Sequence, residues 1–185
     1  MNYIILLALF VGAFTRKVDD HYDKKRRMNK FLLVGLAVAY GALIALIAEA
    51  VPPVISLVLA VLVGLAASGK IDRFGHQIAA LSFVLVSLIF GFAAFGGFNI
   101  AMFLVFLAAG VADEVVSDRC AKRRNLGCRI LSYRPLLEIT AFLVSLYTGV
   151  WEVWLTLLLY DIGAGYVPVL SYAWKAVLKR NYLEC

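Results

Sequence analysis

Long apolar stretches alternate with short polar segments along the whole chain. The apolar stretches cover residues 2–15, 31–49, 54–67, 77–95, 100–111, 136–150 and 153–174. An α-helix needs about 20 apolar residues to cross a bilayer, and the shorter stretches can gain length from their flanking residues. Pro52-Pro53 and Gly96-Gly97 separate neighbouring stretches and are typical of turns. The pattern predicts about seven transmembrane helices in a single domain, residues 1–185.

The positive charges predict an orientation for these helices. All eighteen lysines and arginines fall in four clusters, at residues 16–30, 70–73, 119–134 and 175–180. Basic residues concentrate in cytoplasmic loops, so we expect all four clusters to be cytoplasmic. Two apolar stretches then separate each cluster from the next. This arrangement places the N-terminus outside and the C-terminus in the cytoplasm, and leaves Glu49 and Glu152 as the only charges outside.

Composition agrees with a membrane protein. Of the residues, 63% are apolar and 16% are charged, whereas soluble domains have about 45–50% and about 25%. A soluble fold of this size could not bury so much apolar surface. We therefore expect an all-α, polytopic helix bundle in the cell membrane, with membrane lipids as partners. Soluble enzymes, nucleic-acid-binding domains and disordered chains are excluded, and a homo-oligomer stays open.

Three pairs of potential metal ligands lie near the cytoplasmic ends of the helices expected to run inward. Each pair is spaced i,i+4, which places both side chains on one face of a helix. The pairs are Asp19 with Asp23, Asp72 with His76, and Glu114 with Asp118, and Asp113 adjoins the last pair. Proteins typically hold Mg²⁺ with one or two carboxylates plus substrate phosphates. The sequence thus predicts a metal site, with Mg²⁺ as the expected cofactor, built from Asp19, Asp23, Asp72, His76, Asp113 and Asp118.

The first pair, Asp19 and Asp23, is part of a known sequence pattern. Residues 19–23 read Asp-Asp-His-Tyr-Asp, which is a DDxxD pattern. It resembles the aspartate-rich motif with which prenyl-diphosphate enzymes, including membrane prenyltransferases, hold Mg²⁺ and diphosphate. The resemblance covers these five residues and implies a Mg²⁺–diphosphate site there. Those enzymes have a second full motif, for which residues 113–118 are only a loose substitute, so the chain is not assigned to that family.

Basic residues beside the acidic pairs complete an enzyme hypothesis. Arginine binds phosphate as a bidentate fork and lysine binds it as a point charge. The candidates are Lys70, Arg73, Arg119 and Arg134. Together these residues predict a divalent-metal-dependent enzyme, such as a transferase, that acts at the cytoplasmic face on a polyprenyl- or CDP-linked lipid. The alternative is that these charges only form solvated loops, because surface ion pairs contribute little.

Asp161 favours a different function. It lies within the last apolar stretch and is followed by Gly163, Gly165 and Pro168, which can interrupt a helix. A carboxylate near the bilayer centre costs at least about 2.5–3.5 kcal/mol and is functional by default. It predicts a small cation- or proton-coupled transporter or channel with Asp161 as its ion site. Asp161 could instead only form a hydrogen bond between helices, and a scaffold subunit without chemistry is the third reading.

Small residues predict where the helices pack. Ala37 and Gly41 recur at four-residue spacing, as do Ala60 and Gly64, and Ser87 and Gly91. Lipid tails give helices no hydrophobic reason to associate, so close approach over small side chains has to supply it. We also expect Glu138 to pair with Arg134, one turn earlier.

Overall fold

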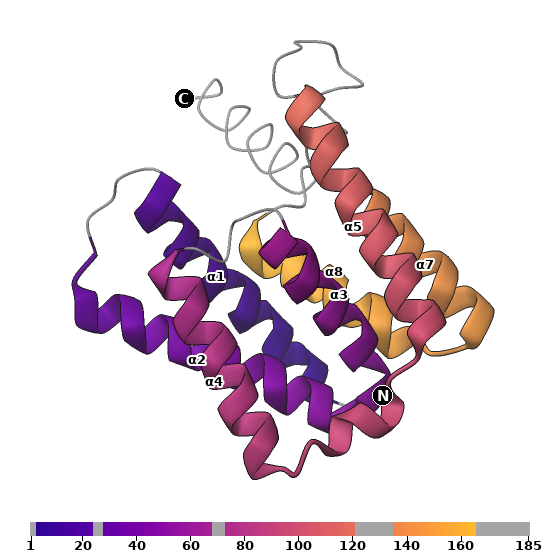
Figure 1. The fold of residues 1–185 in the computed structure, drawn as a ribbon, viewed down its shortest axis with the longest axis horizontal. Helices are drawn as coiled ribbons and strands as arrows, with labels where there is room; N and C mark the ends of the chain where they lie inside the picture. Colours follow the sequence, from indigo (N-terminus) through magenta and orange to yellow (C-terminus); the bar gives the residue numbers. More distant parts are fainter. Residues whose placement is uncertain (1–2, 24–27, 68–72, 121–134, 166–185) are drawn as a thin grey trace, which may run out of the picture.

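The structure, a computed structural model, describes residues 3–23, 28–67, 73–120 and 135–165 (Figure 1). Within these ranges the chain is all α, with seven α-helices and no strand. The helices are α1 (Leu7–Asp23), α2 (Lys30–Ala50), α3 (Ile55–Ala67), α4 (Phe74–Ile89), α5 (Ile100–Cys120), α7 (Pro135–Thr148) and α8 (Trp151–Ala164). Short 3₁₀ turns, η1 (Tyr3–Leu6), η2 (Pro52–Val54) and η4 (Ala93–Gly97), precede α1, α3 and α5.

The seven helices match the seven predicted apolar stretches in order, which confirms the all-α prediction. The predicted bounds were wrong at the polar ends, because α1 continues to Asp23 and α5 continues to Cys120. The DDxxD residues are therefore helical. A hydropathy pattern shows which part of a helix can be buried. It does not show where the helix ends, because the backbone hydrogen bonds of a helix continue through polar residues that favour helical geometry. The predicted interruption of the last stretch is confirmed at Gly165, which has a φ of 70° and follows the last residue of α8.

Asparagine side chains fix two of the helix starts. The side chain of Asn29 accepts a hydrogen bond from the backbone N–H of Phe31 at 3.0 Å. The side chain of Asn99 accepts from the N–H groups of Ala101 and Met102 at 2.9 and 3.1 Å. The first N–H groups of a helix have no partner within the helix. Each asparagine supplies a side-chain acceptor for them and so sets the residue at which α2 or α5 begins.

The helices pack mostly with partners that are distant in the sequence. α1, α2 and α4 form one side of the molecule and α5 and α7 the other, with α3 and α8 between them (Figure 1). α2 packs mainly against α4, and α1 packs against both α2 and α8. α3 packs against α5, which also contacts α7. Consecutive helices are therefore not the main packing unit.

Two turns that the charge pattern places on the same side of a membrane lie together. The carboxylate of Glu49, at the end of α2, accepts a hydrogen bond from the N–H of Ala94 at 2.7 Å. The hydroxyl of Ser56, at the start of α3, accepts from the N–H of Asn99 at 2.9 Å. Turn η2 thus contacts turn η4 at one end of the bundle.

Small residues occupy much of the interior. On α2, Ala37, Gly41, Ala45 and Ala48 are all buried. A Cβ atom at Gly41 would lie 2.2 Å from the carbonyl oxygen of Ala79 on α4, so the two backbones touch there. The predicted packing role is confirmed for Ala37, Gly41 and the buried Ala60. It was wrong for Gly64 and Gly91 as far as the described residues go, since none of them lies within 4 Å of the place where a Cβ would stand.

The closest helix contact was not predicted. A Cβ atom at Gly12 of α1 would lie 2.0 Å from the carbonyl oxygen of Tyr160 on α8. A Cβ atom at Gly163 of α8 would lie 2.0 Å from the carbonyl oxygen of Leu9. Only residues without a side chain allow this approach, so the pair of glycines fixes how α1 crosses α8.

The outer surface is strongly apolar. Each of the seven described α-helices carries exposed large hydrophobic side chains, among them Phe31 on α2, Ile89 on α4 and Tyr147 on α7. By length and composition, α2 alone among the described helices clearly suffices to cross a membrane. Other apolar helices, Pro52–Ala67, Phe74–Ile89 and Pro135–Thr148, have 10–17 residues.

Candidate functional site

A chain of three polar side chains links α1, α4 and α2. Nε2 of His76, in the first turn of α4, lies 3.0 Å from Oδ1 of Asp19 on α1. Nδ1 of the same ring lies 2.7 Å from the hydroxyl oxygen of Tyr40 on α2. A carboxylate only accepts hydrogen bonds, so Nε2 carries the hydrogen that Asp19 accepts. In the neutral ring, Nδ1 then accepts the hydroxyl hydrogen of Tyr40.

Burial increases from Asp19 through His76 to Tyr40. The side chain of Asp19 is 23% exposed and that of His76 is 13% exposed, whereas Tyr40 is 6% exposed. Asp19 is therefore the member most accessible from outside, and Tyr40 anchors the ring from within the bundle. Both ring nitrogens have partners, which fixes the ring plane and directs Nε2 toward Asp19, the most exposed of the three side chains.

Tyr22 and Arg73 adjoin this group. The hydroxyl of Tyr22, on α1, accepts a hydrogen bond from the N–H of Gly75 at 2.9 Å. The guanidinium of Arg73 lies over the ring of Tyr22, 5.6 Å from its centroid. Gly75 allows this approach, since a Cβ atom there would lie 2.8 Å from Val18 of α1. The start of α4 is thus held against the last turns of α1, and Arg73 lies over the ring of Tyr22, whose centroid is 6.5 Å from that of His76.

Two sequence-predicted site residues therefore meet, Asp19 and His76, and Arg73 lies near them over the ring of Tyr22. Asp23 lies one turn beyond Asp19 on α1, but its side chain is outside the described part of the structure. Lys70, Asp72 and Arg134 also lie outside the described residues. The carboxylate of Asp20 lies 3.4 Å from Nε of Arg16 on the same helix.

Asp19 and His76 are both suitable metal ligands, but they are only two. Among the described residues no group of three or more His, Cys, Asp and Glu side chains is placed to hold a metal ion. Asp113 thus does not complete such a group with Asp19 and His76. A metal at this site would need further oxygens, which substrate phosphates typically provide for Mg²⁺.

Asp113 binds the start of another helix. It is 2% exposed, and its two carboxylate oxygens accept hydrogen bonds from the N–H groups of Leu136 and Leu137 at 2.9 and 2.6 Å. These N–H groups are in the first turn of α7 and have no partner within the helix. A carboxylate is also stabilised at a helix N-terminus by the helix dipole. Asp113 therefore ties α5 to α7.

The other predicted residues of α5 lie near its end. The side chain of Asp118 is outside the described part of the structure, and Arg119 is exposed.

Asp161 lies beside a second carboxyl group. Asp161 on α8 and Glu138 on α7 interact through their side chains, and Asp113 is close enough to act on Asp161 electrostatically. Both oxygens of Glu138 are buried, and neither has a hydrogen bond of regular geometry to a described residue. Trp154, on α8, also adjoins Glu138. The two carboxyl groups thus lie near each other between α7 and α8, and both residues are half-buried.

Sequence reasoning missed Tyr40, Tyr22 and the Glu138–Asp161 contact. Tyr40 lies in an apolar stretch, where a tyrosine serves equally as an apolar residue, so no local signal marked its hydroxyl. Tyr22 stands inside the DDxxD segment at one of the positions that the motif leaves free. The predicted pairing of Glu138 with Arg134 concerns a residue outside the described part of the structure.

Comparison with other proteins adds no family to this description. The sequence matches no protein-family model, and neither curated proteins nor solved structures give a significant match. Function has to be argued from the residues themselves.

Proposed function

We propose that this chain is a multi-pass membrane protein, oriented with its C-terminus in the cytoplasm. The support is the apolar outer surface, which carries large exposed residues such as Phe31 and Ile89, around an interior that contains many small residues such as Ala37 and Ala79. In water, so much exposed apolar surface would drive aggregation, whereas in a bilayer it contacts lipid tails.

Cysteine labelling tests this topology. Single cysteines replace Gly96, in turn η4, and Arg73, at the start of α4, in a chain whose own three cysteines are changed to serine. In intact cells a membrane-impermeant maleimide is expected to label the first position and not the second. Lysis should expose the second. Equal labelling of both positions in intact cells would contradict the proposed topology.

We further propose that the protein is a divalent-metal-dependent enzyme, such as a transferase, acting on a phosphorylated or diphosphate lipid, polyprenyl- or CDP-linked, at the cytoplasmic face. The observation that carries this proposal is the 3.0 Å contact between Asp19 and His76. It joins members of two separate predicted ligand pairs across 57 positions of sequence, and Arg73 lies over the ring of the adjoining Tyr22. Asp19 and His76 would bind the metal, with Asp23 and Asp72 nearby in sequence, and Arg73 would bind phosphate.

Matched variants test the enzyme proposal. Asp19→Asn and His76→Gln are compared with Glu152→Gln, which changes a carboxylate in the first turn of α8, away from this site. The purified protein is titrated with a polyprenyl diphosphate and with a CDP-linked diacylglycerol, each with and without Mg²⁺ or Mn²⁺. We expect the first two variants to weaken metal-dependent binding by about tenfold or more, and Glu152→Gln to keep it. Equal metal-dependent binding by all three variants would contradict the proposed site.

The Glu138–Asp161 contact favours a second function, a small proton- or cation-coupled transporter. Buried carboxyl groups that face the interior of a bundle mark ion and proton pathways. Asp161→Asn is expected to abolish proton flux into proteoliposomes, while Glu152→Gln, at the start of the same helix, keeps it. Flux that survives Asp161→Asn would remove this function. If both functions fail, the scaffold reading is left.

A further inference from the structure

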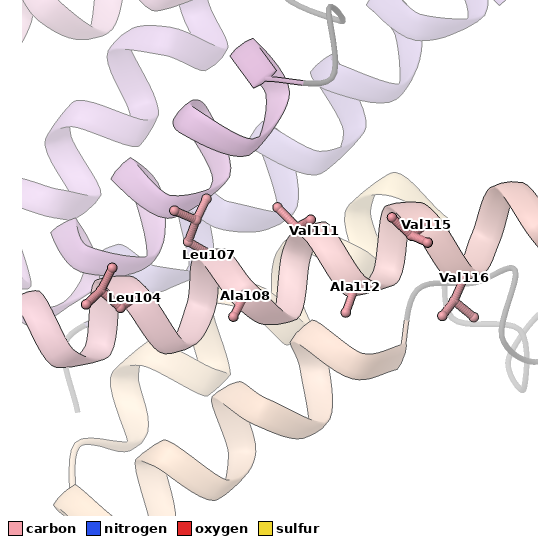
Figure 2. A pocket seen from close by; sticks show the side chains of 7 residues that line it. All are labelled: Leu104, Leu107, Ala108, Val111, Ala112, Val115 and Val116. Atoms are coloured by element: carbon pink, nitrogen blue, oxygen red, sulfur yellow. The ribbon is translucent and has the colours of Figure 1, made fainter.

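A shallow apolar groove, open over most of its surface, runs along α5. Its volume is about 620 Å³, and the aliphatic side chains that line it all belong to α5, between Leu104 and Val116. Figure 2 shows these side chains following one another along the helix. Ala108 and Ala112 lie in the middle, where their short side chains leave room between the larger residues. From Leu104 to Val116 the helix rises about 18 Å at 1.5 Å per residue.

A positive charge continues the groove. Arg119 follows Val115 by four residues and Val116 by three, so it lies on the same face of α5 as the groove lining. Its side chain is exposed. An aliphatic stripe that ends at one guanidinium is complementary to an amphiphile with an aliphatic tail and an anionic head.

We propose that this groove binds a single membrane lipid, with an aliphatic tail along α5 and a phosphate headgroup on Arg119. The guanidinium binds the phosphate as a fork, and the tail fills the space over Ala108 and Ala112. The site rests on the proposed membrane location but not on the Asp19–His76 enzyme site. Its ligand is defined by phosphate together with a tail, so neither a neutral lipid nor a free phosphate ion satisfies it.

Titration with dioleoyl phosphatidic acid tests the proposal. The full chain in mild detergent is titrated and bound lipid is counted by native mass spectrometry. Arg119→Gln is compared with Lys17→Gln, an exposed basic residue on α1. Ala108→Trp, which fills the groove, is compared with Val84→Trp on the exposed face of α4. We expect Arg119→Gln and Ala108→Trp to weaken binding by about tenfold or more, and both controls to stay within about twofold of the wild type.

Control ligands separate the contribution of the aliphatic tail to the affinity from that of the phosphate headgroup. Dioleoylglycerol is expected to bind about tenfold more weakly or worse, and millimolar inorganic phosphate should not displace the lipid. Equal binding of dioleoylglycerol, displacement by phosphate, or no effect of Arg119→Gln would overturn the proposal. If Ala108→Trp does not fold, Ala112→Leu fills the same space, and Arg119→Gln changes only an exposed side chain.

Asp19→Asn distinguishes this site from the enzyme site. It should leave phosphatidic acid binding unchanged even if it abolishes metal-dependent binding. Loss of phosphatidic acid binding in Asp19→Asn would place the phosphate at the Asp19–His76 site and overturn the assignment to α5.

Discussion

The contact between Gly12 and α8 makes a strong prediction for Gly12→Ala. The new Cβ atom would lie 2.0 Å from the carbonyl oxygen of Tyr160 and 2.7 Å from the backbone nitrogen of Ala164. Real Cβ atoms essentially never come within 3.0 Å of such neighbours. Both neighbours belong to the backbone, so no side chain can rotate away. α1 and α8 would have to separate by about 1 Å, which a close-packed interface resists.

The size of the effect follows from a matched control. Gly64→Ala also replaces a glycine within a helix, but no atom of the described residues lies within 4 Å of the added methyl group. Alanine favours a helix over glycine by about 1 kcal/mol at either site, so this gain cancels in the comparison. Overpacking costs about 1–3 kcal/mol. Gly12→Ala should therefore be less stable than Gly64→Ala by about that amount.

Thermal unfolding in detergent, followed by circular dichroism, measures this difference. For a chain of this length it corresponds to a gap of roughly 2–12 °C in Tm. Gly64→Ala is expected to melt at or above the wild-type temperature. Gly163→Ala should resemble Gly12→Ala, and combining the two should cost less than their sum because the first already separates the helices. Equal melting temperatures for Gly12→Ala and Gly64→Ala would refute the α1–α8 contact.

Three further substitutions test individual hydrogen bonds. Asp113→Asn leaves only one carboxamide oxygen for the two N–H groups at the start of α7, and should destabilise the protein by about 1–3 kcal/mol with faster hydrogen exchange at those amides. Tyr40→Phe removes the partner of Nδ1 of His76 and should cost about 0.5–1.5 kcal/mol in the unfolding free energy, with a changed imidazole NMR signal. Ser56→Ala leaves the N–H of Asn99 without its acceptor, and a loss of about 1–3 kcal/mol in denaturant unfolding is expected; an unchanged midpoint would show that water replaces the hydroxyl.

The number and order of the helices could be predicted from the sequence because each apolar stretch corresponds to one helix. The ends of α1 and α5 could not, since their last turns are polar and hydropathy does not report helicity there. Which helices pack against each other also could not be predicted from the sequence. Gly64 and Gly12 look alike in sequence, yet only Gly12 meets another backbone, because partner choice depends on the arrangement of all the helices.

The candidate site was predictable in part. The i,i+4 spacing marked Asp19 and His76 as potential metal ligands, and the structure brings these two side chains into contact, whereas metal binding stays a prediction. The same reasoning grouped Asp113 with them, although its oxygens bind the start of α7. A free carboxylate and a helix-capping carboxylate have the same sequence signature. Only the position of the partner helix, which no local pattern encodes, separates the two.

The pairing of α1 with α8 has a consequence for biosynthesis. The face of α1 that contains Leu9 and Gly12 emerges from the ribosome first among the described helices, whereas α8 emerges last of them. Until α8 is made, that face has no backbone partner, and among the described helices α1 is held by α2 and by the start of α4. The bundle therefore closes after translation of α8, and chains interrupted before Trp151 should be retained by chaperones or degraded even though most of their helices are complete.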